Sequence, residues 1–563
     1  MKGYALVSNT SNCKNCYKCI RSCPVKSISF IDNRAKIINQ DCILCGTCHL
    51  VCPQEVKIVR DDIDDVKKLI QNNERVIVSL APSFVAEYKN SSFKNLKEAL
   101  LKLGFYDVEE TAIGATIVKR AYDEMLNNDD RDIIISSCCH SVNLMIQKHY
   151  PECLPYLADV LSPMLAHGKD IKERYKDAYV VFIGPCIAKK DEVDISKDNY
   201  VDVALTFIEL DKMLQEANII IENEEDKKII EKSKARLFPT EGGILKTMDC
   251  KVKDYEYISL SGVTAVKNAL ESIVNGGVHK CFIEMSMCTA SCIHGPALSK
   301  NYDETIQGYI NVSKSAGKED FEVSDLFYKD IKKTFEKKYL FKAVPSEEDI
   351  QNVLNEMGKK KKQAELNCGS CGYKTCREKA IAILQGRAVK EMCLPYLMEK
   401  SQSFANNIVY NTPNGLMVLD ENLNVQLMNR AMCSLIGIKN KEYILGGNVT
   451  SILDPSAFYD ALEGKIVHGK KEYLAEYDKY VETTVVYDEQ FHILISIMRD
   501  ISTEYKENMR KNDVVQRTIE ITDEVIEKNM RTVQEIANLL GESAAATKVA
   551  LLSLKETLKD DVK

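Results

Sequence analysis

The sequence predicts a multidomain protein of the α/β class, and three observations lead to this prediction. The chain has 563 residues, which is more than one hydrophobic core usually holds. Most of its 21 cysteines fall into tight CxxC groups, which lie before and after a long central region of the sequence. In that region, short apolar runs alternate with amphipathic stretches, as strands and helices do in α/β domains. The predicted domains cover residues 1–62, 70–345, 363–398, 403–502 and 503–563.

Composition and charge argue against two classes of partner. The formal net charge is -8 and the one clearly basic run is Lys359 to Lys362, so no nucleic acid is expected. No apolar stretch approaches the ~18 residues of a membrane span, and no leader is recognisable. We therefore expect a soluble, cytoplasmic protein without a membrane partner. In such a chain, grouped cysteines favour metal ligation over disulfides.

The run C-x2-C-x2-C-x3-C-P occurs twice, at residues 13–24 and 42–53. Such spacing lets three thiolates of one run converge on a small cluster, while the fourth ligates the other cluster. The predicted ligands of two 4Fe-4S clusters are Cys13, Cys16, Cys19 and Cys52 for the first, and Cys42, Cys45, Cys48 and Cys23 for the second. A pair of zinc knuckles is the alternative. The segment resembles a bacterial two-cluster ferredoxin, which carries single electrons, so a ferredoxin-like domain is expected.

Four apolar runs of the central region end in unusual loops. Residues 76–78 lead into APS, 133–135 into SSCCHS, 180–183 into GPCIAKKDE and 281–283 into EMSMCTASCIHG. Sites in parallel α/β sheets form beyond the carboxyl ends of strands, so these loops are expected to converge. Together they supply five thiols, one more than a cubane cluster needs: Cys138, Cys139, Cys186, Cys288 and Cys292. For any single thiol the alternative is a small buried core residue.

These loops resemble the signature motifs of iron-only hydrogenases, which have the forms TSCCP, MPCxxKxxE and ExMxCxxGCxxGG. The similarity includes APSF and, at residues 238–245, FPTEGGIL. The resemblance implies an H-cluster whose cubane is held by Cys139, Cys186, Cys288 and Cys292. Cys292 would also bridge to a two-iron subcluster that carries CO, cyanide and a dithiolate. The residues expected around this cofactor are Ala81, Pro82, Ser83, Ser162, Pro163, Met164, Gly184, Pro185 and Gly242.

Three candidate catalytic residues follow from the same resemblance. Cys138, the spare thiol, would lie beside the open iron site and transfer protons, as a thiol of tunable proton affinity can. Lys189 lies three residues after Cys186, and its ammonium could donate a hydrogen bond to an iron-bound cyanide. A surface lysine is the alternative for that position. Ser286 replaces the methionine that the family has two residues before the third-loop cysteine.

Other positions depart from the efficient enzymes of the family. Gly184 replaces the methionine of the second motif, Met164 replaces the glutamine of an SPQ motif, and His140 replaces the proline of the first motif. The relay serine of the family matches Ala158. No glutamate pair aligns in IGATIVKRAYDEML, although Glu124 is nearby. Because such neighbours tune a cluster, the resemblance implies modest turnover.

A further cysteine group has the spacing C-x2-C-x4-C-x16-C and consists of Cys368, Cys371, Cys376 and Cys393. Four thiolates in so short a segment suit one more 4Fe-4S cluster, with zinc as the alternative. The spacing resembles the small iron-sulfur domain of some redox-complex and corrinoid proteins.

Residues 403–502 resemble a PAS domain of the α+β class, with a short strand, a DENLN turn, a second strand reaching Asn429, a helix and an antiparallel strand pair. Residues 503–563 are charged and predicted to be helical. An apolar residue recurs every seven positions at Ile519, Ile526, Val533 and Leu540, an imperfect coiled-coil stripe suited to a dimer or a partner helix. A second amphipathic helix is expected after Gly541.

This domain order resembles that of sensory iron-only hydrogenases. It implies reversible splitting of H2, with protons and electrons as products, and electron transfer through the 4Fe-4S clusters. The implied partners are ferredoxin or another redox protein, hydrogenase maturation proteins, a second copy in a homodimer, and a signalling partner that contacts the C-terminal helices. Two alternatives remain open: a ferredoxin-linked turnover hydrogenase, and a protein that keeps the cubane alone, as eukaryotic relatives in iron-sulfur assembly do.

Overall fold

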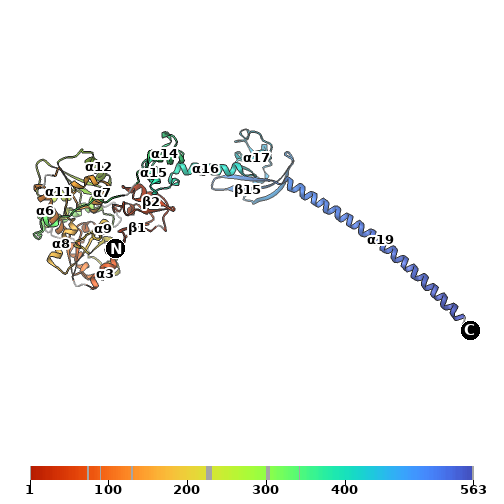
Figure 1. Ribbon diagram of the computed structural model, residues 1–563, viewed down its shortest axis with the longest axis horizontal. Coiled ribbons are helices and arrows are strands. Elements are labelled where there is room, and N and C mark those ends of the chain that lie inside the picture. Colours follow the sequence, from red (N-terminus) through yellow and green to blue (C-terminus); the bar gives the residue numbers. More distant parts are fainter. Residues whose placement is uncertain are drawn as a thin grey trace. The chain divides into compact units, whose positions relative to one another are not determined.

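The computed structural model describes residues 2–9, 11–72, 75–88, 91–128, 131–222, 231–298, 305–340 and 343–560 (Figure 1). The last three residues of the predicted C-terminal segment lie outside these ranges. The chain divides into two compact units, Met1–Leu397 and Met398–Lys563. Among the described residues, no helix combines the length and the apolar character that a membrane crossing requires.

The N-terminal domain repeats in structure what the cysteine runs repeat in sequence. It contains two antiparallel strand pairs, β1 (Leu6–Ser8) with β4 (Lys57–Val59) and β2 (Ile28–Ile31) with β3 (Arg34–Ile37). Each cysteine run forms one short helix, α1 (Lys18–Ser22) or α2 (Thr47–Leu50). Both helices follow a residue with left-handed backbone, Tyr17 at φ 57° and Gly46 at φ 73°. In both runs this residue lies between the second and third cysteine.

The large domain contains two parallel sheets, with strand orders β6-β5-β8-β9 and β10-β11-β7. The strands of the first are β5 (Val76–Leu80), β6 (Asp107–Glu110), β8 (Tyr179–Gly184) and β9 (Val203–Thr206). Those of the second are β7 (Ile133–Ile135), β10 (Glu256–Ser261) and β11 (Cys281–Ser286). Every residue of β5 and β7 is buried, as expected for parallel strands covered on both faces.

Helices surround these sheets. They are α3 (Ile63–Asn72), α4 (Phe84–Glu87), α5 (Phe93–Lys102), α6 (Ala112–Asn128), α7 (His140–His149), α8 (Pro163–Arg174), α9 (Ala188–Asp194), α10 (Phe207–Glu216), α11 (Gly243–Thr247), α12 (Val263–Val274) and α13 (Thr305–Ser315). Short 3-10 turns lie at η1 (Pro151–Tyr156), η2 (Lys234–Leu237), η3 (Ser291–His294) and η5 (Tyr328–Ile331).

The four apolar runs that the sequence singled out are strands, and they are parallel. They are divided between two sheets: β5 pairs with β8, whereas β11 pairs with β7. Leu80 lies opposite Ile183, and Ile135 lies opposite Ile283. Within each sheet the two motif-bearing loops therefore leave neighbouring strands at the same edge.

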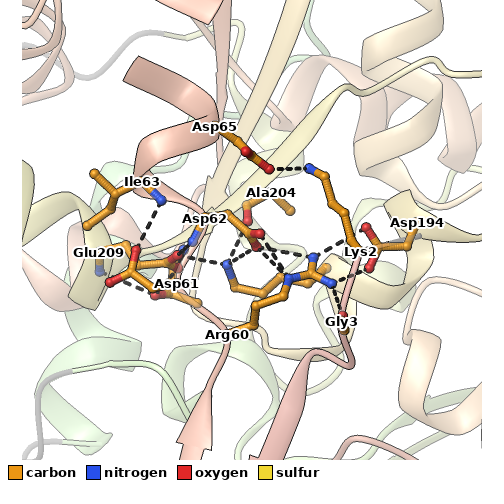
Figure 2. A network of polar contacts seen from close by, with 12 residues as sticks. Lys2, Gly3, Arg60, Asp61, Asp62, Ile63, Asp65, Asp194, Ala204 and Glu209 are labelled. Atoms are coloured by element: carbon orange, nitrogen blue, oxygen red, sulfur yellow. Dashed lines mark hydrogen bonds and ion pairs between the residues drawn. The ribbon is translucent and has the colours of Figure 1, made fainter. Parts of the chain in front are cut away.

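A buried ion network joins the N-terminal domain to the large domain (Figure 2). Lys190, in α9, has a fully buried ammonium that donates to Asp62 Oδ2 at 2.7 Å, Glu209 Oε1 at 2.8 Å and the Ala204 carbonyl at 3.0 Å. Asp62 lies just before α3, where the chain leaves the N-terminal domain, and it also accepts from Arg60. Glu209 closes the capping box at the start of α10. The network thus ties the linker between the two domains to the large domain.

The cysteine-rich domain that follows contains α14 (Glu347–Glu356), α15 (Cys376–Leu384) and the start of α16 (Leu394–Asn411), with 3-10 turns η6 (Lys362–Ala364) and η7 (Lys390–Met392). It packs on the N-terminal domain. Lys26 Nζ donates to the Gly372 carbonyl at 2.8 Å, and Arg387 forms a 2.6 Å ion pair with Asp41. Two domains that are far apart in sequence are therefore neighbours in the first unit.

The second unit has a five-stranded antiparallel sheet of order β13-β12-β16-β15-β14. The strands are β12 (Gly415–Asp420), β13 (Val425–Met428), β14 (Val467–Leu474), β15 (Lys479–Asp488) and β16 (Ile493–Asp500). Helices α17 (Arg430–Leu435) and α18 (Ser456–Leu462) and turns η8 (Lys441–Tyr443) and η9 (Val449–Ser451) connect β13 to β14. Asn429 caps α17 by accepting from the Met432 N–H. The expected strand pair is β15 with β16, and β14 extends it by one strand that the sequence did not predict.

Helix α19 (Ser502–Asp560) is continuous, so the expected break at Gly541 is wrong (Figure 1). A single glycine in a helix interior costs only about 1 kcal/mol. Good helix formers on both sides, including the run Ala544 to Ala546, offset that cost.

Candidate metal centres

The structure brings the eight N-terminal cysteines together in two groups. Burial, together with the neighbouring thiols of Cys52, Cys13 and Cys16, raises the pKa of Cys19 to about 11. In the second group, burial raises the pKa of Cys48, as do the thiols of Cys45, Cys42 and Cys23. One cavity is lined by all four thiols of the second group. Cys23 and Cys52 thus each lie with the three leading cysteines of the other run, the arrangement that the doubled motif predicts.

A second cavity lies where three loops of the large domain meet. Its lining includes four thiols of the large domain, Cys139, Cys186, Cys288 and Cys292. Cys139 precedes α7, Cys186 follows β8, Cys288 follows β11 and Cys292 lies in η3. Four thiols in one cavity fit a cubane cluster. Their role as ligands remains a prediction.

This cavity also borders the N-terminal domain, because Leu44 and Cys45 belong to its lining. Gly46 is in close contact with Pro296 of the large domain. A Cβ atom on Gly46 would lie 2.4 Å from the Pro296 Cβ atom, so no other residue fits without a shift. Cys45, a predicted ligand of the second cluster, therefore lies beside the four-thiol cavity.

The fifth thiol, Cys138, faces a different environment. Its Sγ atom is 3.2 Å from the hydroxyl of Tyr122, a fully buried side chain of α6. The Tyr122 hydroxyl accepts from the Ser137 N–H at 3.0 Å and is 3.4 Å from the Ser137 hydroxyl. Burial raises the pKa of Cys138 to about 12. The two adjacent thiols are thus separated, Cys139 toward the cavity and Cys138 toward α6.

Lys189 is not a surface side chain, since only 11% of it is exposed. Its ammonium donates to the Cys138 carbonyl at 3.1 Å and to Glu192 Oε2 at 2.5 Å. Burial opposes ionisation of Glu192, yet the ammonium groups of Lys189 and Lys333 hold its pKa well below the usual range. Lys189 therefore holds the loop that carries both adjacent thiols.

His140 begins α7 at the position where the family has proline, and it is buried. Its Nε2 atom is 2.8 Å from Asp191 of α9. Burial lowers the pKa of His140, and Asp191 opposes that change. The departure from the family motif thus adds a contact between α7 and α9.

Two of the remaining predicted residues, Pro185 and Ser286, line the four-thiol cavity. The Ser286 hydroxyl is 2.7 Å from that of Ser291. A Cβ atom on Gly184 would lie 2.7 Å from the Phe182 ring and 3.0 Å from the Ala81 Cβ atom. The methionine that the family has at Gly184 therefore does not fit this local packing.

The other predicted cofactor residues lie at strand ends and helix starts of the large domain. Pro82 and Ser83 follow β5 and are buried. Ser162, Pro163 and Met164 begin α8. The buried Ser162 hydroxyl has no hydrogen-bond partner among the described residues, as expected for a group that meets a ligand.

Gly242 has left-handed backbone at φ 72° and precedes α11. Glu284 of β11 contacts this region. It is the first residue of the third motif, and the sequence predicted no role for it. Glu284 Oε2 accepts from the Leu245 N–H at 3.2 Å, and burial raises the pKa of Glu284 to about 7. The leading glutamate of the third motif thus connects it to the FPTEGGIL segment.

Tyr122 was not predicted from the sequence. The expectation for α6 concerned glutamates, but Glu124 accepts from the Tyr328 N–H at 3.2 Å instead of contacting the thiol of Cys138. Ala158, at the family's relay serine, is buried and offers no hydroxyl. A search for any side chain with a hydroxyl or carboxyl on the buried face of α6 would have included Tyr122.

A third four-thiol cavity lies in the domain after residue 345. Cys368, Cys371, Cys376 and Cys393 all belong to its lining, along with Lys379 and Tyr373. Burial lowers the pKa of Lys379 to about 8, while the thiols of Cys371 and Cys393 oppose that change. The donor set fits either a 4Fe-4S cluster or zinc.

Three family models match the chain. The C-terminal domain of the iron-only hydrogenase large subunit, which is the longest match, covers residues 74–296. A 4Fe-4S dicluster domain matches residues 5–53, which contain both N-terminal cysteine runs. An Fe-S cluster domain matches residues 365–395, which contain the third cysteine group.

Similar curated proteins include the NADP-reducing hydrogenase subunit HndD of Solidesulfovibrio fructosivorans, 26% identical over 32% of this chain and 36% of the relative. The periplasmic Fe hydrogenase large subunit of Nitratidesulfovibrio vulgaris is 32% identical over 22% of this chain and 33% of the relative. The cytosolic Fe-S cluster assembly factor NAR1 of Kluyveromyces lactis is 24% identical over 33% and 43%. The chain thus spans less than half the length of these relatives.

Solved structures similar to this chain include a variant of the FeFe-hydrogenase HydA1 from Chlamydomonas reinhardtii. The match has a TM-score of 0.37 and 17% sequence identity, and it covers 45% of this chain and 88% of the hydrogenase chain. The PAS domain of an HTR-like protein from Haloarcula marismortui matches with TM-score 0.16 and 19% identity, covering 19% and 97%. The family models thus show that residues 74–296 are similar to the C-terminal domain of the iron-only hydrogenase large subunit, and that the flanking cysteine groups are similar to Fe-S domains.

Proposed function

We propose that this chain is an iron-only hydrogenase-like protein that binds and reversibly splits H2 at an H-cluster. The observation that carries the proposal is the four-thiol cavity with a fifth, separate thiol next to it. When bound, the H-cluster would supply the irons at which H2 is split. Cys139, Cys186, Cys288 and Cys292 would hold its cubane.

The surrounding residues would move protons and position the loops. Cys138 would exchange a proton with the reacting site, and Tyr122 would hold its thiol at 3.2 Å. Lys189 would fix the backbone at Cys138 through its 3.1 Å hydrogen bond and, on loading, offer a donor to the cofactor. Ser286 lines the cavity and could donate its hydroxyl there.

Electrons would leave through the N-terminal clusters. Cys45 of the second cysteine run lies in the lining of the four-thiol cavity. The domain of the third cysteine group contacts the segment after the first run, where Lys26 donates to the Gly372 carbonyl. This order of sites would carry electrons from the H-cluster to the third 4Fe-4S site. Ferredoxin or another redox protein would exchange electrons with the clusters.

A sensory role is the finer part of the proposal. The five-stranded sheet of the second unit would be a PAS domain, and α19 would pair in a homodimer or bind a signalling partner. The apolar stripe on α19 supports a partner, because Ile526 and Val533 are more than half exposed in the single chain.

A second candidate is a protein that keeps the cubane but lacks the two-iron unit. The similarity to an Fe-S cluster assembly factor and the absence of a hydroxyl at Ala158 favour it. A turnover hydrogenase that uses ferredoxin would share the full H-cluster but have high rates in both directions.

Infrared spectroscopy of the chain produced with hydrogenase maturation proteins separates these candidates. Bands from iron-bound CO and cyanide are expected if the H-cluster is installed, and their absence would overturn both hydrogenase proposals. With the bands present, low rates of H2 oxidation and evolution support the sensory proposal. High turnover in both directions would favour the ferredoxin-linked enzyme instead.

A further inference from the structure

Lys379 is a buried lysine in the wall of the third four-thiol cavity. It lies in the first turn of α15, three residues after Cys376, so the two side chains share one face of the helix. The residue is 1% exposed, and its ammonium has no hydrogen-bond partner among the described residues. All four predicted cluster ligands line the same cavity.

Other buried lysines of the described chain have oxygen partners. Lys190 donates to two carboxylates, and Lys57 donates to the Ser8 hydroxyl and the Ala35 carbonyl. Lys359, in the same cavity wall as Lys379, donates to the Ala364 carbonyl at 3.1 Å. A buried cation without such a partner is strongly destabilising, so the Lys379 side chain requires a negative group that the described residues do not supply.

We propose that Lys379 is the charge partner of the 4Fe-4S cluster in this cavity and that it raises the reduction potential of that cluster. Cluster reduction adds an electron to a group that is already negative because of its four thiolates. A nearby cation in a site of low dielectric constant stabilises the reduced form more than the oxidised form. An N–H donor toward the cluster sulfurs acts in the same direction.

The position of the cavity gives this effect a consequence. The Tyr373 ring is 6.0 Å from the ammonium of Lys379 and 6.0 Å from that of Lys26. Lys26 belongs to the N-terminal domain, and Tyr373 packs in the same hydrophobic core as Cys19 and Cys23. The third cluster would therefore lie next to the N-terminal clusters, and a raised potential would make it an electron acceptor for them.

The test is a redox titration of the full chain, reconstituted with iron and sulfide and followed by electron paramagnetic resonance. In Lys379→Met, one cluster should become about tenfold harder to reduce at a given potential, a shift of about 59 mV for one electron. Iron content should stay equal to that of the wild type unless the charge is also needed to retain the cluster, in which case Lys379→Arg should keep the iron that Lys379→Met loses. Lys374→Met is the matched control, because Lys374 is exposed on the same domain and water screens its charge.

The chain without clusters gives an independent measurement. Removing an unpaired buried ammonium should raise the melting temperature of the cluster-free chain in Lys379→Met, whereas Lys374→Met should leave it unchanged. If Lys379 contributed only the packing of its methylene groups, Lys379→Met would show neither the changed titration nor this stabilisation.

Three results would overturn the proposal. One is a titration identical to wild type in Lys379→Met at full iron content. Another is an iron content that Cys371→Ala leaves unchanged, since no cluster would then occupy the cavity. The third is loss of iron in both Lys379→Met and Lys379→Arg, whereas loss in Met alone, with Arg retaining iron, supports the charge role. None of these results depends on an installed two-iron unit, so they leave the proposed hydrogenase activity untouched.

Discussion

Lys190→Met is expected to destabilise the first unit strongly, because it removes the cation that two buried carboxylates share. The Asp62 and Glu209 side chains are 4% and 5% exposed, and the Lys190 ammonium contacts both at less than 3 Å. Methionine has a similar length and fills most of the space. The change therefore removes the charge with little loss of packing volume.

The magnitude follows from what each carboxylate keeps. Asp62 retains Arg60, whose guanidinium is 2.9 Å away. Glu209 retains three donors, the Asp62 N–H and the N–H and hydroxyl of Thr206, but no cation. Removing one partner of a buried pair costs about 3–5 kcal/mol, and retained hydrogen bonds place the expected loss near the lower end. With a urea m-value of about 3 kcal/mol per molar, the midpoint should fall by about 1 M.

The assay is urea unfolding of the full chain, followed by circular dichroism, with two comparison variants. Lys212→Met removes an exposed ion pair with Asp61 at the same junction and should cost about 1 kcal/mol or less. Adding Glu209→Gln to Lys190→Met should restore part of the loss, because glutamine can close the capping box without a charge. A Lys190→Met midpoint within error of Lys212→Met would refute the reasoning, since the network would then contribute no more than a surface pair.

Three further predictions address the site, acid stability and assembly. Tyr122→Phe should slow H2 oxidation about tenfold or more at unchanged iron content, and Cys138→Ala should slow it further. Loss of the H-cluster itself in either variant would contradict the separate roles of Cys138 and Cys139. Burial opposes ionisation of Glu109, but His167 and Arg174 hold its pKa at about 2. At pH values above 4.5, this lowered pKa contributes roughly 3 kcal/mol to the free energy of unfolding, and the contribution is lost as the pH falls toward 2. The difference in stability between wild type and Glu109→Gln should therefore vanish between pH 4.5 and pH 2. Ile526→Asp should convert a dimer to a monomer in sedimentation experiments if α19 pairs with a second copy, and an unchanged mass would contradict pairing through this stripe.

The cysteine groups could be predicted from the sequence because their spacing is local. Each thiol of a run is placed by the few residues around it, and the repeat supplies the exchange of Cys23 and Cys52 between runs. The strand ends were predicted for a similar reason, since a buried apolar run such as residues 133–135 ends where the polar loop begins. The division into two sheets was not predicted, because strand order depends on pairings between residues far apart in the sequence.

The missed features depend on tertiary contacts or on weak local signals. Strand β14 reads VHGKKEYL, with alternating burial at one edge of the sheet and few apolar residues, so its pattern is easily taken for a loop. Gly541 suggested a helix end, although its neighbours favour helix. In the sequence, Lys190 looks like the second of two equivalent lysines. Its partners, Asp62 and Glu209, lie on either side of it in the sequence, and no local pattern links them.

The adjacent lysines Lys189 and Lys190 connect the four-thiol cavity to the domain junction. Consecutive residues of an α-helix point about 100° apart, so the two side chains of α9 face different parts of the protein. Lys189 holds the loop of Cys138, and Lys190 holds the linker at Asp62. The N-terminal domain is thus held by this linker, by the contact of Gly46 with Pro296, and by Lys148 of α7, which donates to the Cys42 carbonyl at 2.6 Å. Together these contacts limit rotation of the domain and keep Cys45 beside the cavity. Under the proposed function, loss of the Lys190 network should therefore slow electron exchange between the clusters at these two sites, even in molecules that stay folded.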